Sequence, residues 1–128
     1  MDGVVVLIYE ERGYLLIEQG KDPYRGKWGP VHGAIEEGET QEEAVIRETK
    51  EEVRLDVEPD KKITTTPADY KVENLHWWTA ENKGGEIRVD KSEISDYGFF
   101  DLEKIHDLPL LPQTEKFFEE YEDILKED

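Results

Sequence analysis

A predicted helix over residues 40–53 constrains the fold more than any other part of the chain. Thr40 and Glu43 have the spacing of a capping box, in which each side chain satisfies a backbone amide of the other residue. Residues 20–33 are dense in Gly and Pro, which predicts a long loop directly before this helix. The fold must therefore accommodate one well-defined helix that follows a long loop in the sequence, and long loops often carry binding or catalytic residues.

Segments rich in β-branched and aliphatic residues lie on both sides of this helix. Residues 3–9 and 14–18 flank a Glu-Glu-Arg-Gly sequence and predict a β-hairpin. Further strands are predicted at about residues 62–66, 73–81, 86–89 and 97–100, with a turn over residues 82–85. A short helix at 101–105 and an amphipathic helix at 113–126 follow. This order predicts one domain over residues 1–128 with an α/β or α+β sandwich.

Composition restricts the chemistry that the chain can perform. The sequence has no cysteine, which excludes a disulfide, a thiolate metal site and a cysteine nucleophile. Its three histidines, at positions 32, 76 and 106, lack the spacing of zinc ligands. A metal would therefore be bound mainly by oxygen, which favours hard cations such as Mg²⁺ or Mn²⁺.

The charge balance restricts the partners. The formal net charge is −17 at pH 7, and so acidic a surface repels duplex nucleic acid and anionic membranes, which are bound chiefly through Lys and Arg. It does not exclude a small phosphorylated ligand that arrives with metal ions. The longest apolar run, residues 4–9, is too short to span a bilayer and lacks the flanks of a signal peptide, so a cytoplasmic protein is expected.

Three glutamates gather on one side of the predicted helix. Glu48, Glu51 and Glu52 fall within an arc of about 100°, where like charges repel and a divalent cation would offset the repulsion. The alternative is an ordinary solvated helix face, which is common among Glu-rich helices. The Gly-rich loop favours the metal site, because such a loop can bring backbone groups close to a metal and a phosphate.

The stretch from Gly33 to Leu55 resembles the Nudix box, Gly-x5-Glu-x7-Arg-Glu-U-x-Glu-Glu-x-Gly-U, in which U is a bulky aliphatic residue. The matching positions are Gly33, Glu39, Arg47, Glu48, Glu51, Glu52 and Leu55. A chance match of the fixed residues in such a Glu-rich chain is rare, roughly one in several thousand. Segments outside the box also resemble the family, among them residues 26–29, 77–81, 92–94 and 99–103.

The chain departs from the box at two positions. Thr49 stands at an aliphatic position and is expected on the inner side of the helix. Arg54 stands at the glycine that typically ends the helix in a left-handed conformation. Either the helix ends differently here or Arg54 adopts that conformation, at a penalty of about 1 kcal/mol or more. Neither change removes an expected metal ligand.

The resemblance implies a fold and a reaction. The fold is the Nudix α/β/α sandwich, with a mixed β-sheet between helices. The reaction is metal-dependent hydrolysis of a phosphoanhydride bond in a nucleoside diphosphate linked to another moiety. Dinucleoside polyphosphates, (d)NTPs and ADP-sugars all stay open as the small-molecule nucleotide substrate. Many relatives are dimers, and the sequence leaves open whether this chain forms a homodimer.

The resemblance also implies metal ligands. Glu48 and Glu52 are expected to bind the metal directly, with Glu51 as a further direct or water-mediated ligand. The backbone carbonyl of His32 would be another ligand, so its side chain need not matter. Mg²⁺ is the expected ion, with Mn²⁺ as a substitute.

Other residues are expected to support or perform the chemistry. Gly33, Glu39 and Arg47 are structural support, the arginine by orienting the glutamates and Glu39 by stabilising the junction of loop and helix. The general base is Glu48, as first choice, or Glu93 in a later loop. Ordinary surface charge is the alternative explanation for Glu93.

Candidate substrate-binding residues lie outside the box. Arg25 and Lys27 are the nearest cations for a substrate phosphate, although solubility explains them equally well. Trp28 and Tyr70 are aromatic residues that could stack on a nucleobase.

A non-catalytic Nudix-fold module that binds a nucleotide or regulates another protein is the alternative function. Such modules typically lose box carboxylates, whereas this chain retains all of them. A structural acidic domain without a ligand is the third hypothesis.

Overall fold

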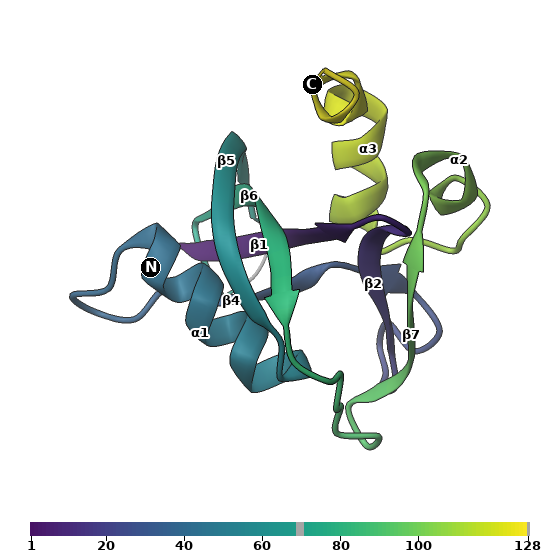
Figure 1. Ribbon diagram of the computed structural model, residues 1–128, viewed down its shortest axis with the longest axis horizontal. Coiled ribbons are helices and arrows are strands. Elements are labelled where there is room, and N and C mark those ends of the chain that lie inside the picture. Colours follow the sequence, from purple (N-terminus) through teal and green to yellow (C-terminus); the bar gives the residue numbers. More distant parts are fainter. Residues whose placement is uncertain (69–70, 128) are drawn as a thin grey trace.

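A mixed β-sheet lies between helices α1 and α3 in the computed structural model, which describes residues 1–68 and 71–127 (Figure 1). Among these residues the sheet has seven strands. The elements are β1 (Gly3–Glu10), β2 (Gly13–Gln19), β3 (Trp28–Gly29), β4 (Val31–Ala34), α1 (Gln41–Val53), β5 (Asp56–Pro67), β6 (Asn74–Gly84), β7 (Ile94–Phe100), α2 (Leu102–Ile105) and α3 (Pro112–Leu125). The predicted sandwich of helices around a mixed sheet is confirmed.

Strand β1 lies at the centre of the sheet. It pairs in parallel with β6 along most of its length, and antiparallel with β4 at its start and β2 at its end. Val4, Val6 and Ile8 pack in the core beneath α1, whereas Val5 and Leu7 pack in the core beneath α3. The continuous apolar run of β1 follows from this position, because helices cover both faces of the strand.

Each main helix covers one face of the sheet through its own apolar core. Ala44, Val45 and Val53 of α1 are buried in the first core. In the second core, Phe117 of α3 stacks on Trp77 of β6 with ring centroids 4.1 Å apart. None of the helices in the described part of the chain combines the length and apolarity needed to cross a membrane.

The two ends of α1 are held differently. At the start, the predicted capping box is confirmed: Glu43 N donates to Thr40 Oγ1 at 3.1 Å, and Thr40 N donates to Glu43 Oε1 at 2.8 Å. At the end, Arg54 adopts the left-handed conformation with φ of 67°, and its N–H donates to Lys50 O. Of the two predicted ways to end the helix, the structure has the one that places strain on Arg54.

Thr49 lies on the inner side of α1, as predicted, and is fully buried. Its hydroxyl oxygen has no hydrogen-bond partner among the residues that the structure describes. A buried hydroxyl without a partner is destabilising relative to an apolar group of the same shape. The aliphatic residue that the Nudix box has at this position would fit the apolar surroundings better.

Two short strands occupy part of the segment that was predicted as a loop. β3 pairs with β2, and β4 pairs with β1, which leaves residues 20–27 as the loop itself. These strands are two and four residues long, so they show no periodicity that could distinguish them from a Gly-rich loop.

The prediction of a strand at residues 86–89 is wrong. β6 continues through the predicted turn as far as Gly84 and pairs with β5, which already begins at Asp56. Residues 86–89 lie outside the sheet, yet Ile87 and Val89 pack against the core beneath α1. Their alternating apolar pattern therefore reflects partly buried side chains and not pairing with a strand of the sheet.

Arg54→Gly tests the strain at the end of α1. Glycine enters the left-handed region without a Cβ clash, so the free energy of unfolding should rise by up to about 1 kcal/mol. Urea unfolding of the variant and the wild type measures the change. Arg54→Ala is the control, because it removes the guanidinium group and keeps the Cβ. A glycine variant less stable than the alanine variant would contradict the assignment.

Candidate active site

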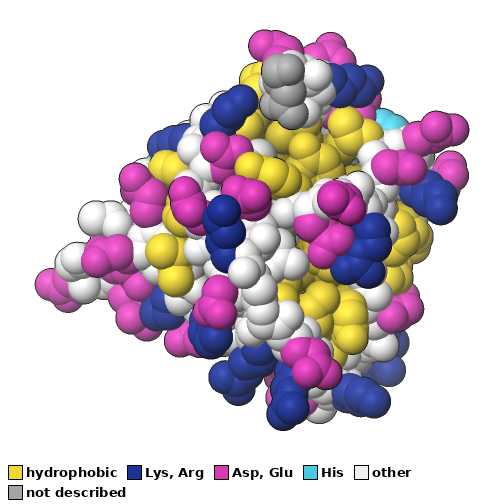
Figure 2. All heavy atoms as spheres, in the orientation of Figure 1, with side chains coloured by type: hydrophobic (Ala, Val, Ile, Leu, Met, Phe, Trp, Pro, Cys, Tyr) yellow, Lys and Arg dark blue, Asp and Glu magenta, His cyan; other side chains and the backbone are white. Residues whose placement is uncertain are grey.

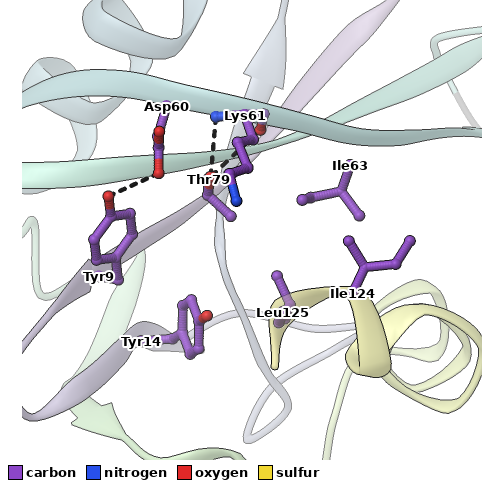
Figure 3. Close-up of a pocket in the computed structure, with 8 residues that line it drawn as sticks. All are labelled: Tyr9, Tyr14, Asp60, Lys61, Ile63, Thr79, Ile124 and Leu125. Carbon is purple, nitrogen blue, oxygen red and sulfur yellow. Dashed lines mark hydrogen bonds between the residues drawn. The ribbon is translucent and has the colours of Figure 1, made fainter. Parts of the chain in front are cut away.

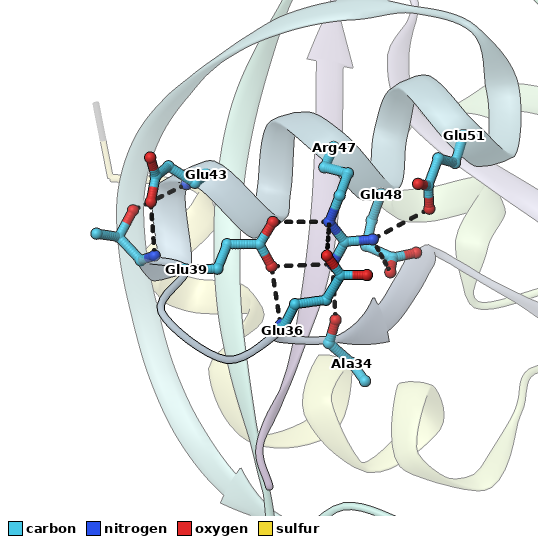
Figure 4. A network of polar contacts seen from close by, with 8 residues as sticks. Ala34, Glu36, Glu39, Glu43, Arg47, Glu48 and Glu51 are labelled. Carbon is cyan, nitrogen blue, oxygen red and sulfur yellow. Dashed lines mark hydrogen bonds and ion pairs between the residues drawn. The ribbon is translucent and has the colours of Figure 1, made fainter.

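Arg47 is the centre of a polar network on α1 (Figure 4). Its Nε and Nη2 donate to the two carboxylate oxygens of Glu39 at 2.7 and 2.9 Å. Its Nη1 donates to Glu48 Oε1 at 2.9 Å and to Glu51 Oε1 at 3.0 Å. Nη2 also donates to the carbonyl of Ala34 at 2.8 Å. The planar guanidinium therefore connects α1, strand β4 and the loop between them.

The bidentate pair of Arg47 and Glu39 is mostly buried, with side chains that are 22% and 12% exposed. Hydrogen bonding to Glu39 raises the pKa of Arg47, and hydrogen bonding to Arg47 lowers the pKa of Glu39. Glu39 also accepts a hydrogen bond from the backbone amide of Glu36 at 2.9 Å. These contacts attach the loop before α1 to the middle of the helix.

Glu48 lies directly over Gly33 of β4. A Cβ at position 33 would overlap the Glu48 carboxylate, so any larger residue would force that carboxylate out of this position. Burial raises the pKa of Glu48, and the hydrogen bond from Arg47 opposes this shift. The carboxylate is thus held against the backbone of β4, where its negative charge is partly desolvated.

Glu52 lies one turn further along α1 and is also partly buried. Burial raises the pKa of Glu52, interaction with His32 opposes this shift, and the charges of Glu48 and Glu93 add to it. Two partly buried carboxylates on one side of a helix therefore stand in surroundings that disfavour their ionised forms.

The residues present fit a hard divalent cation. Carboxylate oxygens are the donors that Mg²⁺ and Mn²⁺ prefer, and a cation would reverse the unfavourable electrostatics of Glu48 and Glu52. In the described part of the chain, no three acidic or histidine side chains already converge on one point. The carboxylates of Glu48 and Glu51 are instead bound by the guanidinium group of Arg47.

Glu93 reaches this region from the loop before β7. Burial is the main cause of the raised pKa of Glu52, and the charge of Glu93 adds to it. Lys21 Nζ donates to Glu93 Oε1 at 2.6 Å. Lys21 was missed by the analysis of the sequence, because no motif links two residues that stand 72 positions apart.

The profile of the NUDIX domain matches residues 1–121. The chain belongs to the Nudix family of hydrolases. The NAD-capped RNA hydrolase NudC of Chromobacterium violaceum is 33% identical over 109 residues, which cover 84% of this chain and 40% of that protein. The chain thus spans about two fifths of the length of the curated relatives that it matches.

Solved structures of the Nudix fold superpose over nearly the whole chain. The MutT protein of Methanosarcina mazei has a TM-score of 0.77 at 22% identity and covers 99% of this chain and 96% of its own. The Ap4A hydrolase of C. elegans has a TM-score of 0.73 at 20% identity, and the match covers 97% of this chain and 98% of the hydrolase. At these identities the likeness establishes the fold.

The Nudix fold buries one of the predicted substrate-binding residues. Trp28 is only 8% exposed and belongs to the core beneath α3. Its ring packs edge-to-face on Phe100 with centroids 5.3 Å apart. The expectation that Trp28 stacks on a nucleobase is therefore corrected: the side chain is needed for packing and presents no free face to a ligand.

The other predicted substrate-binding residues differ in their placement. Arg25 and Lys27 are exposed on the loop over residues 20–27. Arg25 also forms a long ion pair with Asp22, at 3.5 Å. Tyr70 lies outside the residues that the structure describes.

Two cavities lie beside α3, on the face of the sheet opposite to α1. In one of them, side chains from β1, β5 and the end of α3 point into a common space (Figure 3). The other lies between the end of β5 and α3, which lines it from Pro112 to Tyr121. Figure 2 shows charged side chains of both signs over much of the surface, with apolar side chains gathered beside α3. Neither cavity includes a residue of the Nudix box.

Glu39→Gln should change how stability depends on pH. The pKa of Glu39 is lowered from its ordinary value of 4.5 in the folded protein. The ionised carboxylate therefore stabilises the fold above pH 4.5, and this contribution is lost as the pH falls through the lowered pKa. The difference in unfolding free energy between wild type and variant should therefore shrink as the pH falls below 4.5.

Urea unfolding at several pH values between about 7 and 3 measures this difference across the titration range of carboxylates. Glu37→Gln is the matched control, because Glu37 is an exposed residue of the same loop. A wild-type advantage over Glu39→Gln that stays constant across this range would contradict the role of the ionised pair.

Proposed function

We propose that this domain is a metal-dependent pyrophosphohydrolase that cleaves a phosphoanhydride bond in a nucleoside diphosphate linked to another moiety. The observation that carries the proposal is the placement of Glu48 and Glu52, two partly buried carboxylates whose ionised forms are disfavoured without a cation. Membership of the Nudix family of hydrolases supports the reaction class.

Four groups would hold the metal in this proposal. Glu48 and Glu52 would bind it directly, Glu51 directly or through water, and His32 through its carbonyl oxygen. Bound Mg²⁺, or Mn²⁺ in its place, would neutralise the charge of the diphosphate and lower the pKa of a bound water. Gly33 keeps the backbone beneath Glu48 open, and Arg47 with Glu39 holds the glutamates and the loop in register.

The hydrolysis requires a group that accepts a proton from the attacking water. The water oxygen forms a bond to one phosphorus, the bridging P–O bond breaks, and the released phosphate takes the bond electrons. Glu48 and Glu93 are the two candidates for the proton acceptor. Accessibility to water favours Glu93, because Glu48 is partly buried and packed on Gly33, whereas Glu93 lies on an exposed loop.

The substrate in this proposal is a small nucleotide. NudC and Ap4A hydrolase are named for NAD-capped RNA and Ap4A, in which a phosphate bridge joins adenosine to another group. The net charge of −17 disfavours binding of a long nucleic acid. Arg25 and Lys27, on the exposed loop over residues 20–27, are the candidate contacts to the phosphates.

A screen of nucleotides with Mg²⁺ tests the proposed reaction. Purified protein is incubated with dinucleoside polyphosphates, (d)NTPs, NAD and ADP-sugars, and the products are separated by chromatography. At least one compound should be cleaved at a phosphoanhydride bond, and excess EDTA should abolish cleavage until Mg²⁺ or Mn²⁺ is restored. Tight binding of a nucleotide without turnover would instead indicate a non-catalytic module.

Glu52→Gln should lower turnover by a factor of about a hundred or more, as expected when a ligand of a catalytic metal is lost. It should not lower the melting temperature. The pKa of Glu52 is raised in the folded state, so above pH 4.5 its ionised form opposes folding, and neutral glutamine removes that effect.

The matched control is Glu42→Gln, an exposed glutamate in the first turn of the same helix. Steady-state kinetics and thermal melts of the two variants separate a local role in the site from a general effect of charge. Equal activity of Glu52→Gln and wild type would remove Glu52 from the metal site.

A further inference from the structure

We propose that Lys21 is a positioning residue that holds the Glu93 carboxylate at the edge of the glutamate cluster on α1. This inference rests on the proposed function, because it gives Lys21 an effect on hydrolysis through Glu93. Lys21 Nζ donates to Glu93 Oε1 at 2.6 Å. The contact joins the exposed loop before β3 to the exposed loop before β7.

The loop that carries Glu93 is an ordered turn. Asp90 Oδ1 accepts hydrogen bonds from the backbone amide and the hydroxyl of Ser92, at 3.0 and 2.6 Å. The carbonyl of Asp90 accepts from the amides of Glu93 and Ile94, at 2.9 and 2.8 Å. The backbone of Glu93 is therefore set by its own turn, which leaves only its side chain to be placed.

The end of β2 attaches this turn to the loop that carries Lys21. Gly20 N donates to the carbonyl of Glu93 at 2.8 Å, and a Cβ at position 20 would stand only 3.1 Å from that oxygen. Ser95 Oγ donates to Glu18 Oε1 at 2.7 Å on the same side. Lys21 follows directly after this junction, so its side chain needs no rearrangement of either loop to reach Glu93.

The surrounding charges explain why Glu93 needs a cation. The charge of Glu93 acts on Glu52, together with the charges of Glu48 and Glu51 on α1, so Glu93 stands close enough to share the repulsion of the cluster. Repulsion alone would drive an exposed carboxylate away from the cluster and into solvent. The ammonium group of Lys21 offsets that repulsion and keeps the carboxylate on the loop side of the site.

The pair should matter for activity and not for stability. The side chains of Lys21 and Glu93 are 59% and 54% exposed, and exposed ion pairs contribute little to unfolding free energy. A change in turnover without a change in melting temperature therefore separates positioning from a structural role.

A double-mutant cycle tests the proposal on the best nucleotide from the screen, with Mg²⁺ present. Lys21→Met should lower kcat by about tenfold, as expected for a poorly placed general base, with KM within about twofold. In the Glu93→Gln background the same change should lower kcat by less than about twofold, because Lys21 acts only through Glu93. Lys21→Arg should restore most of the rate.

Lys91→Met is the matched control, because Lys91 is an exposed lysine of the same loop as Glu93, and it should keep the wild-type rate. Equal losses in both backgrounds, or a loss confined to KM, would overturn the proposal and indicate a direct phosphate contact. Wild-type turnover by Glu93→Gln would also overturn it. A wild type that cleaves no nucleotide would refute the proposed function itself, and this inference with it.

Discussion

Repulsion among the carboxylates of α1 is the constraint to which the rest of the site responds. Glu48, Glu51 and Glu52 lie on one side of a single helix, and Glu93 adds its charge from a neighbouring loop. Such an arrangement opposes folding unless cations are close by. Arg47 supplies a cation within the helix, and its contacts to Glu48 and Glu51 neutralise part of the excess negative charge. The negative charge that remains would be available to a divalent cation.

The scaffold around this cluster is stable for reasons independent of it. β1 is buried on both faces, and β4 pairs with its first half, which places Gly33 at a fixed position in the sheet. α1 packs on the same sheet through Ala44 and Val45. Glu48 is therefore brought over Gly33 by two rigid elements, and the unfavourable electrostatics of the site are offset by the apolar cores.

The departures from the Nudix box remove none of the glutamates and affect stability. Thr49 points into the core, on the opposite side of α1 from the solvent. Arg54 takes the left-handed conformation that glycine would enter freely, and the chain beyond β6 returns to this helix end, where Arg88 N donates to Val53 O at 3.1 Å. Val53 and Leu55, the neighbours of Arg54, are buried, so the end of the helix is fixed by packing although the glycine of the motif is absent.

The sequence by itself determined α1, its capping box and the set of carboxylates on one side of it, because these depend on contacts within a few residues. It also determined the class of the fold, since strands around two main helices pack in few ways. Only the tertiary structure decided that Trp28 is core, that residues 86–89 lie outside the sheet and that Lys21 meets Glu93. Burial and strand register join residues far apart in the chain, and such contacts leave no local pattern in the sequence.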